Sequence, residues 1–350
     1  MNRDMLFVMH VPWSWIKQRP HFLAEELAKK GSMVRVLHPG KEKSKKGNVA
    51  LIPEIGSKHF PYWLNKYFRL IQWIFLYLKS DVIWLCFPSQ FAWFKKCSTF
   101  FGKKKLVYDC MDDHAHFFTS DKAISDFLEM EKKVIVQTDV LFFSSQKLMD
   151  TWEQRIGTMK GVVINNALSK EGQSEKNEHP ELKEQFSKDE HFKLIYVGTI
   201  SKWMDLDLIM RLLREVESIR IYLIGPCEIK LPKHPRLFHQ PPVEHSYIPW
   251  ILSKANALFM PFKLNALIES VDPVKAYEYI YTGKPTFLKK YGETLKFRDN
   301  AFLYDNFEDF HLEILKSINQ RERKAVENVA FLKNNNWGKR VTEILNCLEE

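Results

Sequence analysis

The residues from Glu269 to Pro285 combine a possible anion-binding helix start with a possible sugar-binding carboxylate. Asp272 and Pro273 are expected at the N-cap and at the first position of a helix, where both residue types are favoured. The N–H groups at a helix N-terminus have no partner within the helix and attract anions. Lys275 and Glu278 lie three residues apart, so they project from one side of this helix. Together these groups could hold a nucleotide diphosphate and its ribose.

The same segment also fits a well-capped surface helix with no ligand. Gly283 stands where a C-cap glycine is expected, and Pro285 precedes an apolar strand at Thr286–Leu288. Local chemistry alone favours this plainer interpretation, because helix caps are common.

A second group of polar residues follows a strand expected at Leu106–Asp109. Asp112, Asp113, His114 and His116 all lie within seven residues of the end of that strand, where open α/β sheets bind their ligands. A carboxylate or imidazole there could act as a general base toward a hydroxyl, or bind a sugar by hydrogen bonds. Taken alone, the cluster is equally consistent with a capped turn.

Two tryptophans and two cations follow the first expected strand, Met5–His10. Trp13 and Trp15 offer ring faces for stacking on a sugar, and Lys17 and Arg19 could pair with a phosphate. The alternative is that the tryptophans anchor a loop in the core.

The stretch from Lys58 to Lys105 is both basic and aromatic. It holds nine Lys or Arg, fifteen aromatic residues and a single acid, Asp81, in a chain whose net charge is +9. Such a pattern suits a helix lying on anionic lipid. Core aromatics with solvated lysines are the alternative interpretation, and nucleic-acid binding is a weaker one. We therefore expect a membrane surface as partner, and no nucleic acid.

The composition is that of a globular protein: of 350 residues, 45% are apolar and 27% are charged. The five cysteines are scattered and form no CxxC pair, so we expect neither a disulfide framework nor a structural metal. The N-terminus lacks the pattern of a signal peptide, and no apolar run is long enough to span a membrane. These features predict a cytoplasmic protein, peripheral at the inner face of the cell membrane.

Short apolar runs alternate with helical patterns, which predicts parallel sheets in an α/β fold. The composition becomes strongly polar near residue 169 and apolar runs return near residue 194. We therefore expect an N-terminal Rossmann-like acceptor domain, a polar linker, a C-terminal Rossmann-like nucleotide-sugar domain and a final helix, at residues 1–168, 169–193, 194–333 and 334–350.

In this order, the motifs resemble those of bacterial GT-B glycosyltransferases of the family-4-like and teichuronic-acid type. Residues 269–285 resemble the "DPxKxxEYxxxGKP" form of their nucleotide-sugar motif, and residues 11–28 resemble their "W…QRPxxLAxxLA" motif. Residues 196–205 resemble the "YxGxxxxxxD" turn that opens their donor domain.

This resemblance implies two Rossmann-like domains facing across a cleft, with a C-terminal helix that returns toward the N-terminal domain. It implies a UDP- or GDP-linked sugar as donor, a saccharide or lipid-linked acceptor, no cofactor and no metal, since GT-B enzymes characteristically work without an Asp-x-Asp metal motif. The residues it assigns to the donor are Gly198, Thr199, Lys202, Val243, Ser270, Asp272, Pro273, Val274, Lys275 and Glu278. It makes Asp112, Asp113 and His114 the catalytic candidates, with Asp112 preferred.

The chain departs from its relatives at position 270. The family-4 pattern has a glutamate eight residues before the second one, Glu278, but this chain has Ser270. We expect backbone N–H groups around Ser270–Val274 to replace that carboxylate. Retention and inversion of the anomeric configuration of the sugar both stay open. Two alternative functions also stay open: an epimerase of the same fold, and a non-catalytic protein that binds membrane surfaces.

Overall fold

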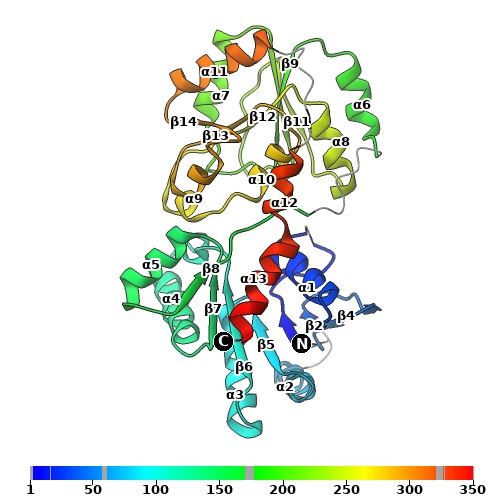
Figure 1. Ribbon diagram of the computed structural model, residues 1–350, viewed down its shortest axis with the longest axis vertical. Coiled ribbons are helices and arrows are strands. Elements are labelled where there is room, and N and C mark those ends of the chain that lie inside the picture. The colour runs from blue at the N-terminus through cyan, green and yellow to red at the C-terminus, as the bar shows by residue number, and fades with distance from the viewer. Residues whose placement is uncertain are drawn as a thin grey trace. The chain divides into compact units, whose positions relative to one another are not determined.

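The computed structural model describes residues 3–15, 17–56, 61–169, 177–320, 326 and 328–349. The chain folds into two compact units, which are drawn in Figure 1. The first unit contains Met1–Asn166 together with Trp337–Glu350, and the second contains Ala167–Asn336. Lys58, the first residue of the predicted basic aromatic stretch, lies outside the described residues, as do residues 170–176 of the predicted linker.

An eight-stranded sheet forms the centre of the first unit, in the order β3-β4-β2-β1-β5-β6-β7-β8. All neighbouring strands are parallel except β3 and β4. The strands are β1 Asp4–Val8, β2 Met33–His38, β3 Ser44–Lys46, β4 Val49–Pro53, β5 Val82–Leu85, β6 Lys105–Cys110, β7 Val140–Phe143 and β8 Gly161–Val163. The strand order reverses between β1 and β5.

Helices cover both faces of this sheet. They are α1 Arg19–Lys29, α2 Tyr62–Leu78, α3 Phe91–Phe101, α4 Asp121–Ile135, α5 Gln146–Ile156 and α13 Trp337–Glu349, with short 3₁₀ helices η1 Pro88–Gln90 and η2 His114–Phe117. Side chains alternate between the faces of a strand. Leu6 and Val8 accordingly join the core with α2, α3, α4 and α5, while Phe7 stacks on Trp84 on the other face. The last helix, α13, packs beside α1 (Figure 1).

The second unit has a six-stranded, fully parallel sheet in the order β11-β10-β9-β12-β13-β14. Its strands are β9 Phe192–Val197, β10 Ile219–Ile224, β11 Leu237–Gln240, β12 Ala257–Met260, β13 Thr286–Lys289 and β14 Phe302–Tyr304. The order corresponds to that of a Rossmann sheet and reverses between β9 and β12.

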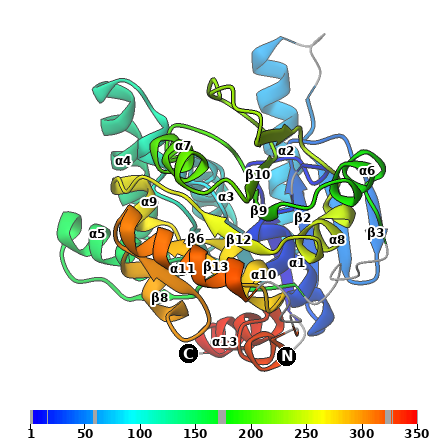
Figure 2. The same ribbon diagram turned by 90° about the horizontal axis from the view of Figure 1, so that it is seen from above.

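The helices of the second unit are α6 Pro180–Ser187, α7 Leu206–Glu215, α8 Ile248–Ser253, α9 Ala266–Ser270, α10 Val274–Tyr281, α11 Phe307–Asn319 and α12 Val329–Asn334, with 3₁₀ helices η3 His245–Tyr247 and η4 Gly292–Phe297. Figure 2 shows α7 and α11 on one side of the sheet, and α6, α8 and α10 on the other. Contacts agree with this view, since Arg211 of α7 pairs with Glu308 of α11, and Phe186 of α6 stacks on Trp250 of α8.

The predicted α/β class with two Rossmann-like halves is confirmed, and the C-terminal helix returns to the first unit. The predicted polar linker, 169–193, contains a helix that its composition conceals. Leu182 and Phe186 of α6 are buried in the core of the second unit, and β9 already begins at Phe192. Two apolar residues one turn apart are enough to attach this otherwise polar helix to the unit.

Among the described residues, no helix combines the length and apolar character that crossing a membrane requires.

Candidate functional sites at the strand ends

The reversal of strand order in each sheet defines where a ligand would bind, because the loops on either side of this point separate and leave a crevice. In the first unit, that point lies between the carboxyl ends of β1 and β5. His10 follows β1 and Phe87 follows β5, and their rings stack at 5.2 Å. His114, which comes after β6, meets both rings edge-on, with its centroid 5.8 Å from His10 and 5.2 Å from Phe87.

Both imidazoles in this cluster are held neutral at pH 7. Burial, with a smaller contribution from the neighbouring His114, lowers the pKa of His10 to about 4. Burial also lowers the pKa of His114. The Nδ1 atom of each ring is buried and has no hydrogen-bond partner among the residues that the structure describes, so a polar ligand or water would normally supply one. His10 carries no role in the sequence-based prediction, although its position at the carboxyl end of the first strand was a usable signal.

Asp112 and Asp113 lie beside this cluster, after β6. Burial raises the pKa of Asp112 to about 7, with Arg19 opposing the shift and Asp109 and Asp113 adding to it. Asp113 places one carboxylate oxygen 3.4 Å from His116 Nε2 and has its other oxygen buried without a partner. Of the three residues predicted as catalytic, His114 contacts His10 and Phe87, and Asp112 and Asp113 lie in the loop immediately before it.

Arg19 lies in the core of the first unit, only 5% exposed. Its Nε donates to both carboxylate oxygens of Asp109 at 3.1 and 3.0 Å, and its Nη1 donates to the Ile164 carbonyl oxygen at 2.6 Å. This corrects the expectation that Arg19 meets a phosphate, because its guanidinium is already occupied and shielded from solvent. The pair instead fixes the start of α1 against β6.

The other three residues predicted to contact acceptor or phosphate lie nearer the surface. Trp15 is exposed. Trp13 is half-buried, and its ring packs on His21 at 4.9 Å. Lys17 Nζ pairs with Glu25 at 2.6 Å, within its own stretch of chain. Of the four, Trp15 has the freest side chain, and the sugar-stacking role stays a prediction.

In the second unit, the turn after β9 approaches the turn after β10 very closely. A Cβ atom built on Gly225, where φ is +138°, would lie 2.3 Å from the carbonyl oxygen of Gly198. The Tyr196 hydroxyl donates to the Thr199 carbonyl oxygen at 2.9 Å and supports the same turn. Gly198 and Thr199, both predicted diphosphate contacts, therefore lie in a compact turn at the point where the strand order reverses.

The chain beyond this turn is attached to the strand on the other side of the reversal. The backbone N–H of Asp205 donates to the Pro261 carbonyl oxygen, and that of Lys263 donates to the Trp203 carbonyl oxygen, both at 2.7 Å. Just before these contacts, Lys202 is exposed and forms no ion pair with any residue that the structure describes. Its ammonium group is therefore available to an anionic ligand.

Helix α10 is fixed directly beneath the end of β9. The Tyr279 hydroxyl accepts a hydrogen bond from the Val197 N–H at 2.7 Å and donates to the Val197 carbonyl oxygen at 3.2 Å. One turn earlier, Lys275 Nζ lies 3.0 and 2.8 Å from the two carboxylate oxygens of Glu278. The predicted placement of Lys275 and Glu278 on one side of the helix is confirmed. The pair lies on the helix that supports the 198–199 turn.

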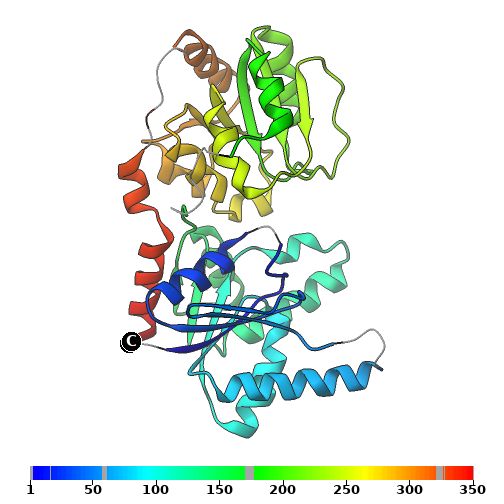
Figure 3. The same ribbon diagram turned by 90° about the vertical axis from the view of Figure 1, so that its right-hand side faces the viewer.

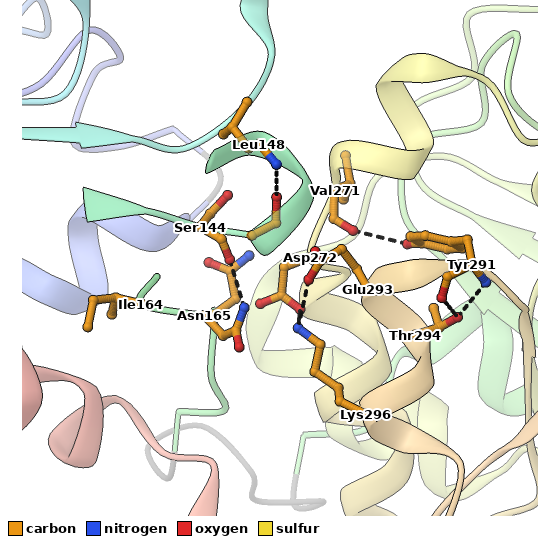
Figure 4. Close-up of polar contacts among 12 residues, drawn as sticks. Ser144, Leu148, Ile164, Asn165, Val271, Asp272, Tyr291, Glu293, Thr294 and Lys296 are labelled. Atoms are coloured by element: carbon orange, nitrogen blue, oxygen red, sulfur yellow. Dashed lines mark hydrogen bonds and ion pairs between the residues drawn. The ribbon is translucent and has the colours of Figure 1, made fainter. Parts of the chain in front are cut away.

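The start of α10 differs from the prediction. Pro273, rather than Asp272, occupies the N-cap position, and no side chain caps the helix. The Asp272 carboxylate instead accepts hydrogen bonds from the Tyr277 hydroxyl and from Lys296 Nζ, the latter at 2.9 Å. Figure 4 shows Lys296 between Asp272 and Glu293. A buried carboxylate gains more from a cation and a phenol than from a backbone N–H, and this explains the shift.

The remaining predicted donor residues occupy varied environments. Ser270 is buried, and its hydroxyl donates to the Leu267 carbonyl oxygen at 2.7 Å. Pro273 is buried and Val274 half-buried at the start of α10. Val243, the predicted base contact, lies half-buried in the loop after β11, against the core of the second unit. The role of each in donor binding stays a prediction.

Among the described residues, no group of three or more His, Cys, Asp or Glu side chains is arranged to hold a metal ion.

Comparison with protein-family models gives no match, and neither does comparison with curated protein sequences. Solved structures do match. Sucrose-phosphate synthase from Thermosynechococcus elongatus aligns over 99% of this chain and 98% of its own, with a TM-score of 0.69 at 11% identity. HepE from Anabaena, in complex with UDP-glucose, aligns over 99% of this chain and 100% of its own, with a TM-score of 0.68 at 13% identity. WaaG, a glycosyltransferase of lipopolysaccharide biosynthesis, aligns over 98% of this chain and 95% of its own, with a TM-score of 0.61 at 12% identity. This chain therefore has the GT-B fold of these glycosyltransferases.

Proposed function

We propose that the protein is a glycosyltransferase that moves a sugar from a nucleotide-sugar donor to a saccharide acceptor. The observation that carries this proposal is the attachment of α10 to the end of β9. Through Tyr279, the Lys275–Glu278 pair is held beneath the compact turn at Gly198 and Thr199. A close-approaching backbone turn, a cation and a carboxylate are the groups that a diphosphate and a ribose require.

Two further facts support a nucleotide-sugar donor. HepE, which shares the fold, was solved in complex with UDP-glucose and, separately, with UDP. Lys202 adds an exposed ammonium to the same turn. We propose UDP- or GDP-linked sugars as donors, bound by Gly198, Thr199, Lys202, Lys275 and Glu278, with Val243 near the base.

The proposed reaction is attack of an acceptor hydroxyl on the anomeric carbon of the donor sugar, with release of the nucleoside diphosphate. The new glycosidic bond forms as the bond to the diphosphate oxygen breaks, and the hydroxyl proton passes to a base. Lys202, Lys275 and the N-terminal dipole of α10 would stabilise the charge that develops on the diphosphate, without a metal.

Asp112 is the proposed base. Its pKa of about 7 lies near the working pH, which favours proton transfer in both directions. His10 and His114 are neutral and have unpartnered buried nitrogens beside it, so they would orient a sugar by hydrogen bonds. Asp113, held by His116, would support the position of this loop.

We further propose that the acceptor is a growing, lipid-linked cell-surface saccharide, as in capsule, O-antigen or teichuronic-acid synthesis. The enzyme would then work in the cytoplasm as a family-4-like, peripheral protein at the inner face of the cell membrane. The motifs at residues 11–28 and 269–285, together with the basic aromatic helices of the first unit, support this narrower assignment.

A donor screen tests the proposal. UDP- and GDP-sugars are added singly, and the melting temperature and the release of nucleoside diphosphate are measured. A cognate donor at a hundred times its dissociation constant should stabilise the protein by about 2.7 kcal/mol. Lys275→Ala and Glu278→Gln should each abolish this shift. The matched control is the pair Glu313 and Lys316, which has the same spacing on α11; Lys316→Ala and Glu313→Gln should leave the shift intact.

The products separate the alternatives. Conversion of the donor into an epimer would assign the protein to the epimerases of this fold. Binding without release of nucleoside diphosphate, with any acceptor tried, would favour the non-catalytic alternative. One observation favours the latter: Ser270 bonds back to its own helix, and Asp272 is held by Tyr277 and Lys296. If no nucleotide sugar shifts the melting temperature, the proposed function is wrong.

A further inference from the structure

Helix α2 has two apolar faces, and within the described part of the chain only one of them has a partner. Trp73, Leu76 and Tyr77 are buried in the core of the first unit. A second set of apolar side chains on the same helix is exposed to solvent. A helix that is apolar on more than one side normally has both sides covered. The second face of α2 is therefore a candidate binding surface.

The exposed side chains form a continuous stripe. Trp63, Tyr67, Ile71 and Phe75 follow one another at steps of four residues, and Leu78 continues the row. Their exposed fractions are 69%, 57%, 46%, 55% and 52%. Residues four apart lie above one another on a helix, so these five side chains cover one side of α2 along its length. Figure 3 shows α2, the long blue helix, extending outward from the sheet of the first unit.

The end of α3 adds to this surface. The Tyr77 hydroxyl donates to the Gly102 carbonyl oxygen at 2.6 Å, which fixes the end of α3 beside the last turn of α2. Phe100 and Phe101, immediately before Gly102, are 80% and 42% exposed. We call the five side chains of the α2 stripe with these two phenylalanines the α2–α3 surface.

The charges on these helices are all of one sign. Neither α2 nor α3 contains an Asp or Glu. Lys66, Lys79 and Lys96 are exposed, and none of them is within ion-pair distance of a carboxylate on any described residue. Lys79 Nζ lies over the ring of Phe75 at 4.0 Å, and Lys96 Nζ lies over the ring of Trp93 at 5.2 Å. The cations thus lie directly beside the exposed aromatic rings.

We propose that the α2–α3 surface is the face by which the protein binds an anionic lipid bilayer. Trp and Tyr side chains favour the boundary between headgroups and hydrocarbon, and lysines beside them meet lipid phosphates. A protein partner of this charge would need a complementary acidic groove, whereas an anionic bilayer supplies both the apolar layer and the charge. The proposal gives the inner-face location a defined surface. It is tested without any donor, so its failure would leave the proposed transfer reaction unaffected.

Flotation with lipid vesicles tests this surface. The whole chain is mixed with vesicles of phosphatidylcholine alone, or with about one third phosphatidylglycerol, at low and at high salt. Binding should occur with the anionic vesicles and weaken with salt. Trp63→Ser combined with Phe75→Ser should reduce binding at least tenfold. Lys66→Glu combined with Lys96→Glu should also reduce vesicle binding at least tenfold, since each cation near an anionic bilayer raises the affinity for it roughly fivefold.

Matched controls come from the second unit. Leu312 and Val329 are exposed apolar residues at 55% and 62%, and Lys233 and Lys254 are exposed cations. Leu312→Ser with Val329→Ser, and Lys233→Glu with Lys254→Glu, should keep binding within about twofold. Equal melting temperatures of all variants would show that folding is intact. A variant that unfolds is replaced by Tyr67→Ser alone, which removes one exposed ring.

Three results would overturn the proposal. The first is absence of binding to anionic vesicles at low salt, and the second is binding that the α2 and α3 variants leave unchanged. The third is evidence that something other than a bilayer occupies the surface, with vesicle binding absent. Such evidence would be a dimer seen in sedimentation, or a complex with a single-stranded oligonucleotide, that the double variant Trp63→Ser with Phe75→Ser no longer forms.

Discussion

Asp112 is the side chain on which the proposed chemistry depends most. Its pKa of about 7, raised mainly by burial, makes it a better base at neutral pH than an ordinary aspartate. Asp112→Asn keeps the shape of the side chain but cannot accept a proton. We expect kcat/KM for transfer to fall at least tenfold, measured as nucleoside diphosphate release. Asp126→Asn, on the exposed side of α4, is the control and should have no effect.

The pH profile provides an independent check on Asp112. If Asp112 is the base, kcat/KM of the unmodified enzyme should rise as pH increases through about 7, and this rise should disappear in the Asn variant. A loss of less than tenfold with the profile unchanged would remove Asp112 from the mechanism.

Glu131 predicts a pH dependence of stability. It is 1% exposed and accepts a hydrogen bond from the Tyr108 hydroxyl at 2.5 Å, and burial raises its pKa from 4.5 to about 7. A carboxyl group with a raised folded-state pKa stabilises the protein at low pH, and this contribution is lost as pH rises from 4.5 to 7. Glu131→Gln mimics the protonated form. The free energy of unfolding of this variant, relative to that of the unmodified protein, should therefore increase by about 2–3 kcal/mol between pH 5 and pH 8.

Urea unfolding at these two pH values measures the effect. The neighbouring Glu129 is exposed on the same helix, so Glu129→Gln should show no such gain. Parallel pH profiles for the Glu131→Gln protein and the unmodified protein would show that Glu131 is ionised in both states, contrary to the expectation.

At the scale of elements, the second unit positions its candidate site through three attachments. The turn after β9 packs closely against Gly225 in the turn after β10. The chain that follows it is hydrogen-bonded to the segment after β12 through Asp205 and Lys263. Tyr279 of α10 binds the end of β9 itself. Elements that are separated along the chain thus converge at the carboxyl ends of the strands. These contacts hold the 198–202 turn in one conformation.

Gly225→Ala tests this convergence. The new Cβ would meet the Gly198 carbonyl oxygen at 2.3 Å, at a φ of +138° that alanine rarely adopts. We expect a loss of about 2 kcal/mol or more in unfolding free energy, and about tenfold weaker nucleotide binding, because the 198–199 turn must move. Gly157→Ala is the control, since Gly157 also has positive φ but nothing lies within 4 Å of its Cβ position. Equal effects on nucleotide affinity for the two variants would contradict a role for the turn.

At the scale of the whole molecule, the first unit is completed by the last residues of the chain. Trp337 of α13 is 2% exposed and stacks on Phe22 of α1 at 5.3 Å. Arg3 and Lys105 both donate to the Leu348 carbonyl oxygen, at 2.9 and 2.6 Å. The core of the first unit therefore includes residues that follow the second unit in the sequence.

Trp337→Ala should consequently destabilise the first unit by about 3–5 kcal/mol, the usual cost of emptying a buried tryptophan site. Urea unfolding, followed by tryptophan fluorescence and circular dichroism, measures the change. Trp15→Ala is the control with the same chemistry, since Trp15 is 57% exposed, and it should cost under about 0.5 kcal/mol. A similar small effect for Trp337→Ala would mean that α13 contributes little to the core.

Much of the fold could be predicted from sequence because the strands are buried on both faces and appear as short apolar runs. The strands predicted at Met5–His10, Leu106–Asp109 and Thr286–Leu288 are present as β1, β6 and β13, with ends that differ by at most two residues. The short strands β3, β11 and β14 were not predicted, since their few buried residues are diluted by polar neighbours, and the burial of α6 in the core could not be read from its polar composition. The GT-B resemblance, which rests on motif order rather than on any single motif, agrees with the fold.

What the sequence determined by itself was local: the apolar runs, the presence of a helix after Asp272 and the Lys275–Glu278 spacing, because these depend on neighbours along the chain. Only the tertiary structure decided which polar groups are free. It buried Arg19 against Asp109, turned Asp272 toward Lys296, and left the Nδ1 atom of His10 without a hydrogen-bond partner among the described residues. Such outcomes depend on which partners the sheets bring together, since a buried charge takes the strongest partner within reach, wherever that partner lies in the sequence.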